Sequence, residues 1–104
     1  MRSVSVQELK AVLDDDAAGE ALVVDVREPW EYAEGHVPGA VPMPLATVPQ
    51  RAGELPADRA VYLVCAVGAR SGQAAAYLSR LGVDAVNVAG GTSEWASAGF
   101  PVER

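Results

Sequence analysis

The chain has 104 residues, half of them hydrophobic, and its 8 basic and 14 acidic residues give a formal net charge of −6. That length predicts one domain over residues 1–104, since domains usually contain ~100–200 residues. The acidic balance argues against a nucleic-acid binder. The sequence has neither a signal-peptide core nor an apolar run near the ~20 residues of a membrane helix, which predicts a cytoplasmic protein with no membrane partner.

The first twenty residues predict a strand, a helix and a loop. The strand begins at Val4, and a helix follows it because Ser5 and Glu8 have the spacing of a capping box. The acidic triplet at 14–16 and then Gly19 are typical of a solvated polar loop.

The next segment predicts two more strands. The apolar run 22–24 is expected to be a strand, and a short helix is expected around 30–33. The turn-rich segment 35–40 then leads into residues 41–44. Two prolines in that last segment favour a short strand at the edge of a sheet.

The centre of the chain contains the pattern that matters most for function. Residues 45–54 are expected to be helical, with an interruption at Pro49. The β-branched and aromatic run 60–64 predicts a buried strand that ends at Cys65. Apolar residues at helical spacing predict a helix over 73–81.

The carboxyl-terminal part repeats the alternation of strand and helix. Gly82 suits the position just past a helix end, and residues 85–88 predict the last strand. Gly90 and Gly91 turn into a helix over 92–98, with Gly99 and Pro101 as its stop.

This order of elements predicts an α/β fold, with a five-stranded, mostly parallel sheet covered by helices on both faces. In such sheets ligands bind outside the carboxyl ends of the strands. Asp25, Cys65 and Gly90 all follow predicted strands, so we expect them to be neighbours in space.

Cys65 is the single cysteine, which excludes an internal disulfide and a Cys-x-x-Cys redox pair. It lies at a predicted strand-to-helix turn, where backbone N–H groups and the helix dipole favour an anion. Such a place can hold a thiolate or an anion bonded to one. No group of His, Cys and carboxylate residues has metal-site spacing, so we expect neither a metal nor another cofactor.

Three segments together resemble the rhodanese (sulfurtransferase) homology domain, in the order that the family has them. They are Asp25-Val26-Arg27-Glu28-Pro29-Trp30-Glu31-Tyr32 with Gly35-His36-Val37-Pro38-Gly39-Ala40, then Cys65-Ala66-Val67-Gly68-Ala69-Arg70-Ser71, then Gly90-Gly91-Thr92-Ser93-Glu94-Trp95 with Ala98-Gly99-Phe100-Pro101-Val102. The resemblance covers nearly the whole chain and implies one rhodanese-like domain with a parallel five-stranded sheet.

The resemblance also implies a chemistry. Cys65 is then the catalytic nucleophile, which takes sulfane sulfur as a persulfide from a small donor anion and passes it to cyanide or a thiol. The substrate lies in the loop formed by Ala66, Val67, Gly68, Ala69 and Arg70. Asp25, Arg27 and Ser71 are expected to support that loop. Once the thiolate exists, no adjacent general base is needed.

Two features of the loop limit the choice of substrate. Four residues separate Cys65 from Arg70, whereas the related cysteine phosphatases have five, so the tighter ring of amides favours sulfur over phosphate. Some thiosulfate-using members carry basic residues where this chain has Ala66 and Val67. A persulfide or polysulfide is therefore an alternative donor to thiosulfate.

Several alternatives stay open from the sequence. The chain can be a sulfur-relay module that delivers its persulfide to an acceptor protein, and less favoured readings are a phosphatase or an arsenate reductase. Arg70 either contacts substrate or ties the loop to an acidic neighbour. Asp25 is expected to contact the loop, His36 to be a hydrogen-bonded turn residue, and Trp30 to pack or to cover the pocket mouth.

Overall fold

The computed structural model describes residues 1–15 and 21–104. Five strands form one sheet in the order β1-β5-β4-β2-β3, and all four pairings are parallel. The predicted parallel sheet is thus confirmed, with an isolated antiparallel bridge between His36 and Glu103 outside it. The strands are β1 (Arg2–Val4), β2 (Leu22–Asp25), β3 (Val41–Pro42), β4 (Ala60–Val64) and β5 (Asp84–Val88).

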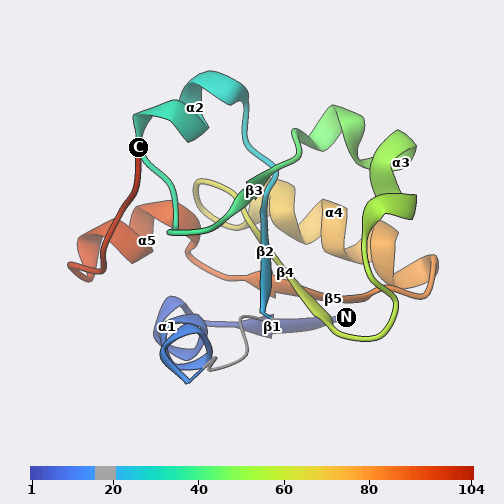
Figure 1. Cartoon of the computed structure of the whole chain (residues 1–104), viewed down its shortest axis with the longest axis horizontal. Helices are drawn as coiled ribbons and strands as arrows, with labels where there is room; N and C mark the ends of the chain where they lie inside the picture. Colours follow the sequence, from blue (N-terminus) through green and yellow to red (C-terminus); the bar gives the residue numbers. More distant parts are fainter. Residues whose placement is uncertain (16–20) are drawn as a thin grey trace.

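Helices cover both faces of the sheet, as Figure 1 shows. α1 (Val6–Asp14) and α5 (Gly91–Ser97) lie on one side, and α3 (Val48–Arg51) and α4 (Ala69–Arg80) lie on the other. α2 (Pro29–Glu34) follows the carboxyl end of β2. Two 3₁₀ turns, Leu45–Thr47 and Ala52–Glu54, flank α3. Within the described ranges, no helix is long and apolar enough to cross a membrane.

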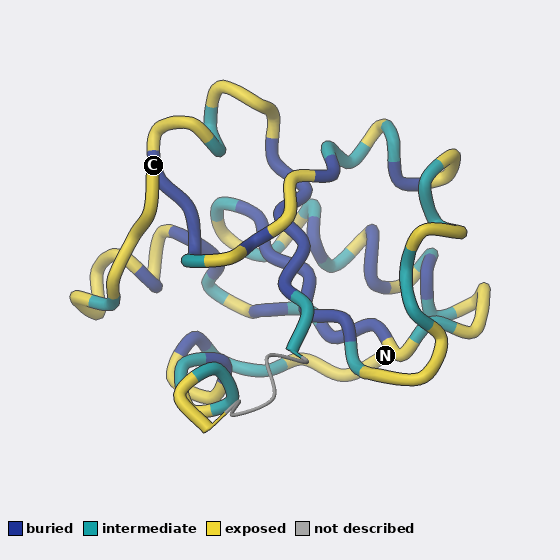
Figure 2. The backbone as a smooth tube through the Cα atoms, in the orientation of Figure 1, coloured by how far each residue is buried: buried dark blue, intermediate teal, exposed yellow. Residues whose placement is uncertain are grey.

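The alternation of side chains along β4 divides the core in two. Val61, Leu63 and Cys65 contribute to the cluster under α4, while Tyr62 and Val64 contribute to the cluster under α1 and α5. Both clusters are buried, and the strands at the centre of Figure 2 accordingly carry the buried colour. A strand covered on both faces explains why the run before Cys65 is apolar without interruption.

Several predicted boundaries shift. β1 ends at Val4 rather than beginning there, because Ser5 caps α1 with the expected capping box to Glu8. Pro49 does not interrupt the helix over 45–54. It lies in the first turn of α3, where its missing N–H costs nothing, and the 3₁₀ turns mark the irregular ends.

The largest shift concerns α4, which begins at Ala69 instead of Gln73. Gly68 adopts φ +106° at the N-cap and turns the chain directly into the helix. The polar residues of the first turn interrupt the apolar periodicity there, which is why the pattern placed the start one turn late. Asp14 ends α1 as expected, whereas Asp16 and Gly19 lie outside the described residues.

Candidate functional site

The candidate site lies at the carboxyl end of β4, the central strand of the sheet. β4 ends at Val64, and residues 65–68 form a loop that passes directly into α4. Because α4 begins at Ala69, Arg70 and Ser71 both lie in its first turn, close behind the loop. Cys65 is therefore located between the end of a buried strand and the amino terminus of a twelve-residue helix.

Hydrogen-bond donors converge on the sulfur of Cys65. The Gly68 N–H donates to Sγ at 3.0 Å, and the Ser71 hydroxyl lies 3.3 Å from the same atom. Burial raises the pKa of the Cys65 thiol, but hydrogen bonds from the side chain and backbone of Ser71 and from the backbones of Gly68 and Val67 outweigh it. The net effect lowers the pKa of Cys65 below its ordinary value, so the site favours a thiolate.

The amino terminus of α5 holds the loop from the other side. The Thr92 N–H donates to the Cys65 carbonyl at 2.8 Å, and the Ser93 N–H donates to the Ala66 carbonyl at 3.0 Å. Gly91 makes this approach possible, because a Cβ there would lie 2.4 Å from the Cys65 carbonyl oxygen. Gly90 is also close to the loop, because a Cβ added to Gly68 would lie 3.4 Å from the backbone N of Gly90. The expected proximity of Gly90 to Cys65 is thus correct.

The sulfur lies beneath the loop rather than in an open pocket. Cys65 is 1 % exposed, whereas Val67 on the loop is 66 % exposed. A hollow of about 270 Å³ exists elsewhere, lined by Lys10, Leu13, Asp14, Pro38, Trp95 and Pro101, and none of these residues belongs to the loop. Access to Sγ is therefore restricted, which favours small reactants.

One contributor to the site was missed by the sequence reasoning. Asn87 of β5 places its Oδ1 2.6 Å from the Ser71 hydroxyl oxygen. The hydroxyl carries a single proton, which it can donate either to Asn87 or to Sγ of Cys65, so Asn87 competes with the sulfur. The only sequence signal was a polar residue inside an otherwise apolar strand, 85–88.

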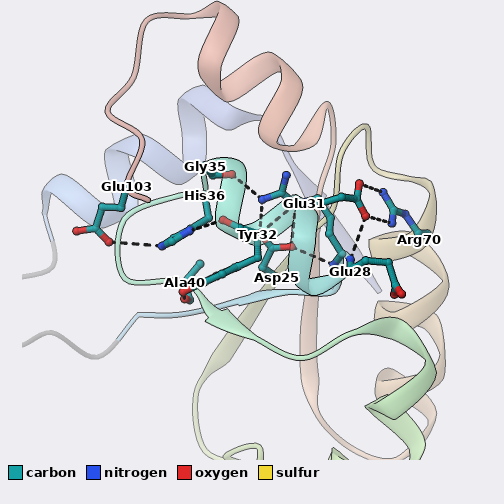
Figure 3. Close-up of polar contacts among 10 residues, drawn as sticks. Asp25, Glu28, Glu31, Tyr32, Gly35, His36, Ala40, Arg70 and Glu103 are labelled. Carbon is teal, nitrogen blue, oxygen red and sulfur yellow. Dashed lines mark hydrogen bonds and ion pairs between the residues drawn. The ribbon is translucent and has the colours of Figure 1, made fainter.

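Arg70 is bound by a carboxylate. Its Nη1 and Nη2 donate to Oε1 and Oε2 of Glu31 in α2 at 2.7 and 2.9 Å. Figure 3 shows the two side chains pointing at each other. The hydrogen bonds from Arg70 lower the pKa of Glu31 to about 2. Of the two roles expected for Arg70, the structure contains the ion pair to an acidic neighbour.

Asp25 and Arg27 form a second ion pair, which is almost fully buried. Arg27 donates through its backbone N, Nε and Nη2 to the Asp25 carboxylate at 2.8 to 3.2 Å. Arg27 Nη2 also donates to the Gly35 carbonyl at 2.8 Å. The expected pairing is present, but the Asp25 carboxylate binds Arg27 instead of the loop. Asp25 is still adjacent to the loop, since it pairs with Val64 across the sheet.

Tyr32 of α2 and the segment that follows it are linked by hydrogen bonds and a ring stack. The Tyr32 hydroxyl donates to the Ala40 carbonyl at 2.6 Å, and its ring stacks on His36. His36 Nδ1 donates to the Tyr32 carbonyl at 2.9 Å, and its backbone pairs with Glu103. His36 is thus the hydrogen-bonded turn residue that was expected. Trp30 is 65 % exposed and does not pack in the core.

No metal site is visible in the described parts of the chain, because nowhere do three His, Cys, Asp or Glu side chains gather suitably. What the arrangement offers is a single sulfur whose pKa is lowered by hydrogen bonds from backbone amides and a hydroxyl. That is the requirement for nucleophilic attack by a thiolate.

Comparisons with known proteins identify relatives of this chain in both sequence and structure. The rhodanese-like domain model matches residues 5–98. A protein of Allochromatium vinosum named sulfurtransferase is 44 % identical over 84 residues, which are 80 % of this chain and 78 % of that one. The putative sulfur carrier protein YrkF of Bacillus subtilis is 38 % identical over 88 % of this chain, which spans about half (49 %) of its length.

Among solved structures, a rhodanese-related protein of Thermoplasma volcanium superposes with a TM-score of 0.90 and 31 % identity, covering 99 % of this chain and 98 % of that one. Sequence and structure therefore agree with the resemblance found in the three motifs. The chain belongs to the rhodanese-like domain family, and the two relatives described above are named a sulfurtransferase and a putative sulfur carrier protein.

Proposed function

We propose that this chain, as one rhodanese-like domain, is a sulfurtransferase that carries sulfane sulfur as a persulfide on Cys65. The observation that carries the proposal is the convergence of the Gly68 amide and the Ser71 hydroxyl on Sγ, at 3.0 and 3.3 Å. Groups that stabilise the thiolate also suit the terminal sulfur of a persulfide, which is likewise an anion.

In the first half of the cycle the Cys65 thiolate attacks the outer sulfur of the donor. With thiosulfate, the bond between the two donor sulfurs breaks, sulfite leaves with the electron pair, and Cys65 keeps the outer sulfur as a persulfide. With an organic persulfide, the leaving group is the thiolate of the donor. The reaction consumes no redox equivalent, and a thiolate that is already formed needs no general base. The hydrogen bonds that lower the pKa of Cys65 favour that thiolate.

In the second half, cyanide or a thiol attacks the terminal sulfur, and Cys65 leaves as the thiolate from which the cycle began. The loop amides stabilise that leaving group, so the same hydrogen-bond donors act in both halves of the cycle. Residues 66–70 form the rim through which both reactants pass. Asp25 and Arg27 support the adjoining segment after β2 through their ion pair and the bond from Arg27 to the Gly35 carbonyl.

A sulfur relay to an acceptor protein is the second candidate. The likeness to YrkF, named as a putative sulfur carrier, favours it, as does a sulfur covered by a loop that bears the exposed Val67. In that case the nucleophile in the second half is a thiol of the partner protein.

Intact-mass measurement tests the proposal directly. After incubation with thiosulfate or an organic persulfide and removal of excess donor, the protein should be heavier by one sulfur atom. Cyanide or a thiol should remove that sulfur, and Cys65→Ser should never acquire it. If no donor adds sulfur at Cys65, the proposed function is wrong. Loading followed by rapid transfer to a partner but negligible turnover with small thiols selects the relay.

A further inference from the structure

Four charged side chains beside the loop form two ion pairs, which we call the charge network. Asp25 binds Arg27. Glu31 binds Arg70, as Figure 3 shows. The two pairs also interact electrostatically. The charge of Arg27 lowers the pKa of Glu31, and the charge of Asp25 raises the pKa of Arg70. Two carboxylates face two guanidinium groups, so the network brings no net positive charge to the site.

Arg70 is the cation closest in sequence to the loop, and its charge interacts with Cys65. Yet both of its terminal nitrogens are engaged by one carboxylate in a bidentate geometry. Glu31 is well placed to hold Arg70, since the Glu31 side chain is only 15 % exposed. Its pKa is lowered to about 2, so the carboxylate is ionised at neutral pH. The pair therefore persists throughout the neutral range.

The rim of the loop adds no compensating charge. Ala66 and Val67 occupy its second and third positions, and Val67 is 66 % exposed. Other basic residues with ion pairs, Arg2, Lys10 and Arg51, lie on β1, α1 and α3, away from the loop. On a chain of net charge −6, a dianion approaching the Cys65 thiolate meets amide dipoles but no uncompensated cation of this network.

We propose that Glu31 is a specificity-determining residue. By holding the Arg70 guanidinium, Glu31 biases Cys65 toward sulfur donors with a single negative charge at the reacting end, such as organic persulfides and thiosulfonates, and against the dianion thiosulfate. This inference rests on the proposed persulfide cycle and names the class of donor that the cycle accepts.

The size of the effect follows from Coulomb's law. Removing one negative charge beside the site, in surroundings close to water in their dielectric constant, changes the rate for each unit of donor charge by roughly fivefold. The change in electrostatic energy is twice as large for a dianion as for a monoanion. The ratio of the dianion rate to the monoanion rate therefore also changes by roughly fivefold. Salt reduces the effect, since the Debye length at 0.15 M is ~8 Å.

The test compares two donors that differ in charge but share one reaction. Thiosulfate and methanethiosulfonate both give up an outer sulfur to a thiolate, and they release sulfite and methanesulfinate respectively. Glu31→Gln removes the charge but keeps an oxygen to accept the Glu28 N–H that now binds Glu31. Glu34→Gln is the matched control, because Glu34 is exposed on the same helix and its side chain does not hold Arg70.

The readout is the rate at which Cys65 acquires one sulfur in a single turnover, measured by intact mass at low salt. We expect Glu31→Gln to raise the ratio of thiosulfate to methanethiosulfonate rates roughly fivefold, and Glu34→Gln to change it less than twofold. The difference should shrink at 0.5 M salt. An unchanged ratio in a folded Glu31→Gln protein overturns the inference.

A second variant decides the matter if Glu31→Gln does not fold. Val67→Lys adds a cation at an exposed position and should raise the same ratio, and an unchanged ratio again overturns the inference. Failure of the proposed function looks different. In that case neither donor loads Cys65 in any variant, including the wild type.

Discussion

The Ser71 hydroxyl offers the sharpest test of how the thiolate is stabilised. Ser71 is fully buried, and its oxygen lies 3.3 Å from Sγ of Cys65. Its side-chain hydrogen bond is the largest of the influences that lower the pKa of Cys65, while burial acts in the opposite direction. Ser71→Ala removes this donor without adding volume. The pKa of Cys65 should therefore rise.

The magnitude follows from the strength of one hydrogen bond. A bond to a charged acceptor contributes about 1.5 kcal/mol, and about 1.4 kcal/mol corresponds to a factor of ten. At a pH below the pKa, Ser71→Ala should therefore reduce the thiolate fraction, and the rate of alkylation with it, by about tenfold. The competing bond to Asn87 reduces the effect, since the Ser71 hydroxyl must turn away from Oδ1 of Asn87 before it can donate to the thiolate.

The assay is the rate of reaction with iodoacetamide across pH 5 to 10, under reducing conditions. Dividing each rate by its alkaline plateau removes differences in access, so the inflection reports ionisation alone. Ser79→Ala, near the other end of α4, is the matched control and should leave the inflection in place. Asn87→Ala should act in the opposite direction from Ser71→Ala, because it frees the hydroxyl proton for Sγ.

Two results would refute this reasoning. One is a Ser71→Ala profile that superposes on the wild type after normalisation, which would mean that the hydroxyl serves only Asn87. The other is an Asn87→Ala profile that shifts to higher pH, which would mean that Asn87 helps the thiolate instead of competing with it.

Three further substitutions test the scaffold of the site, each by urea unfolding. Gly91→Ala should cost about 3 kcal/mol or more, because φ +58° disfavours a side chain and the new Cβ would meet the Cys65 carbonyl, and a cost under 1 kcal/mol would contradict that. Arg27→Met should cost about 3–5 kcal/mol, since it leaves Asp25 charged and 1 % exposed, and adding Asp25→Asn should recover much of this loss. Glu31→Gln should cost about 1–2 kcal/mol at pH 7, reduced by screening at the one-third exposed Arg70. Because the pKa of Glu31 is lowered from 4.5 to about 2 on folding, that last difference should be complete above pH 4.5 and disappear as the pH falls to about 2.

The strands and the position of the cysteine could be predicted because local patterns determine them. Residues 60–64 alternate between two buried faces, so the run is continuously apolar and ends where the loop begins. The Ser5 and Glu8 capping box likewise acts within one turn. Such features involve neighbours in sequence, and a single sequence contains the necessary information.

The missed features depend on contacts between distant segments. Asn87 reaches Ser71 across 16 residues, and Glu31 reaches Arg70 across 39. No periodicity indicates which acidic residue will meet a given arginine, so both roles for Arg70 remained open until α2 was placed next to α4. The late start predicted for that helix has the same origin, because Arg70 and Ser71 are selected by contacts with other elements.

The anionic state of Cys65 can also be tested without any sulfur donor, through the stability of the fold. Hydrogen bonds lower the pKa of Cys65 below its ordinary 9.0 despite burial, so between the folded pKa and 9.0 the unfolded chain binds more protons than the folded one. The thiolate therefore contributes stability that is complete above pH 9.0 and is lost as the pH falls through the folded pKa. Wild type should gain stability relative to Cys65→Ser as the pH rises toward 9, measured by urea unfolding with reductant present. A difference that stays constant from pH 6 to 9 would mean that folding does not favour the thiolate, and the amides around Sγ would then have no electrostatic role.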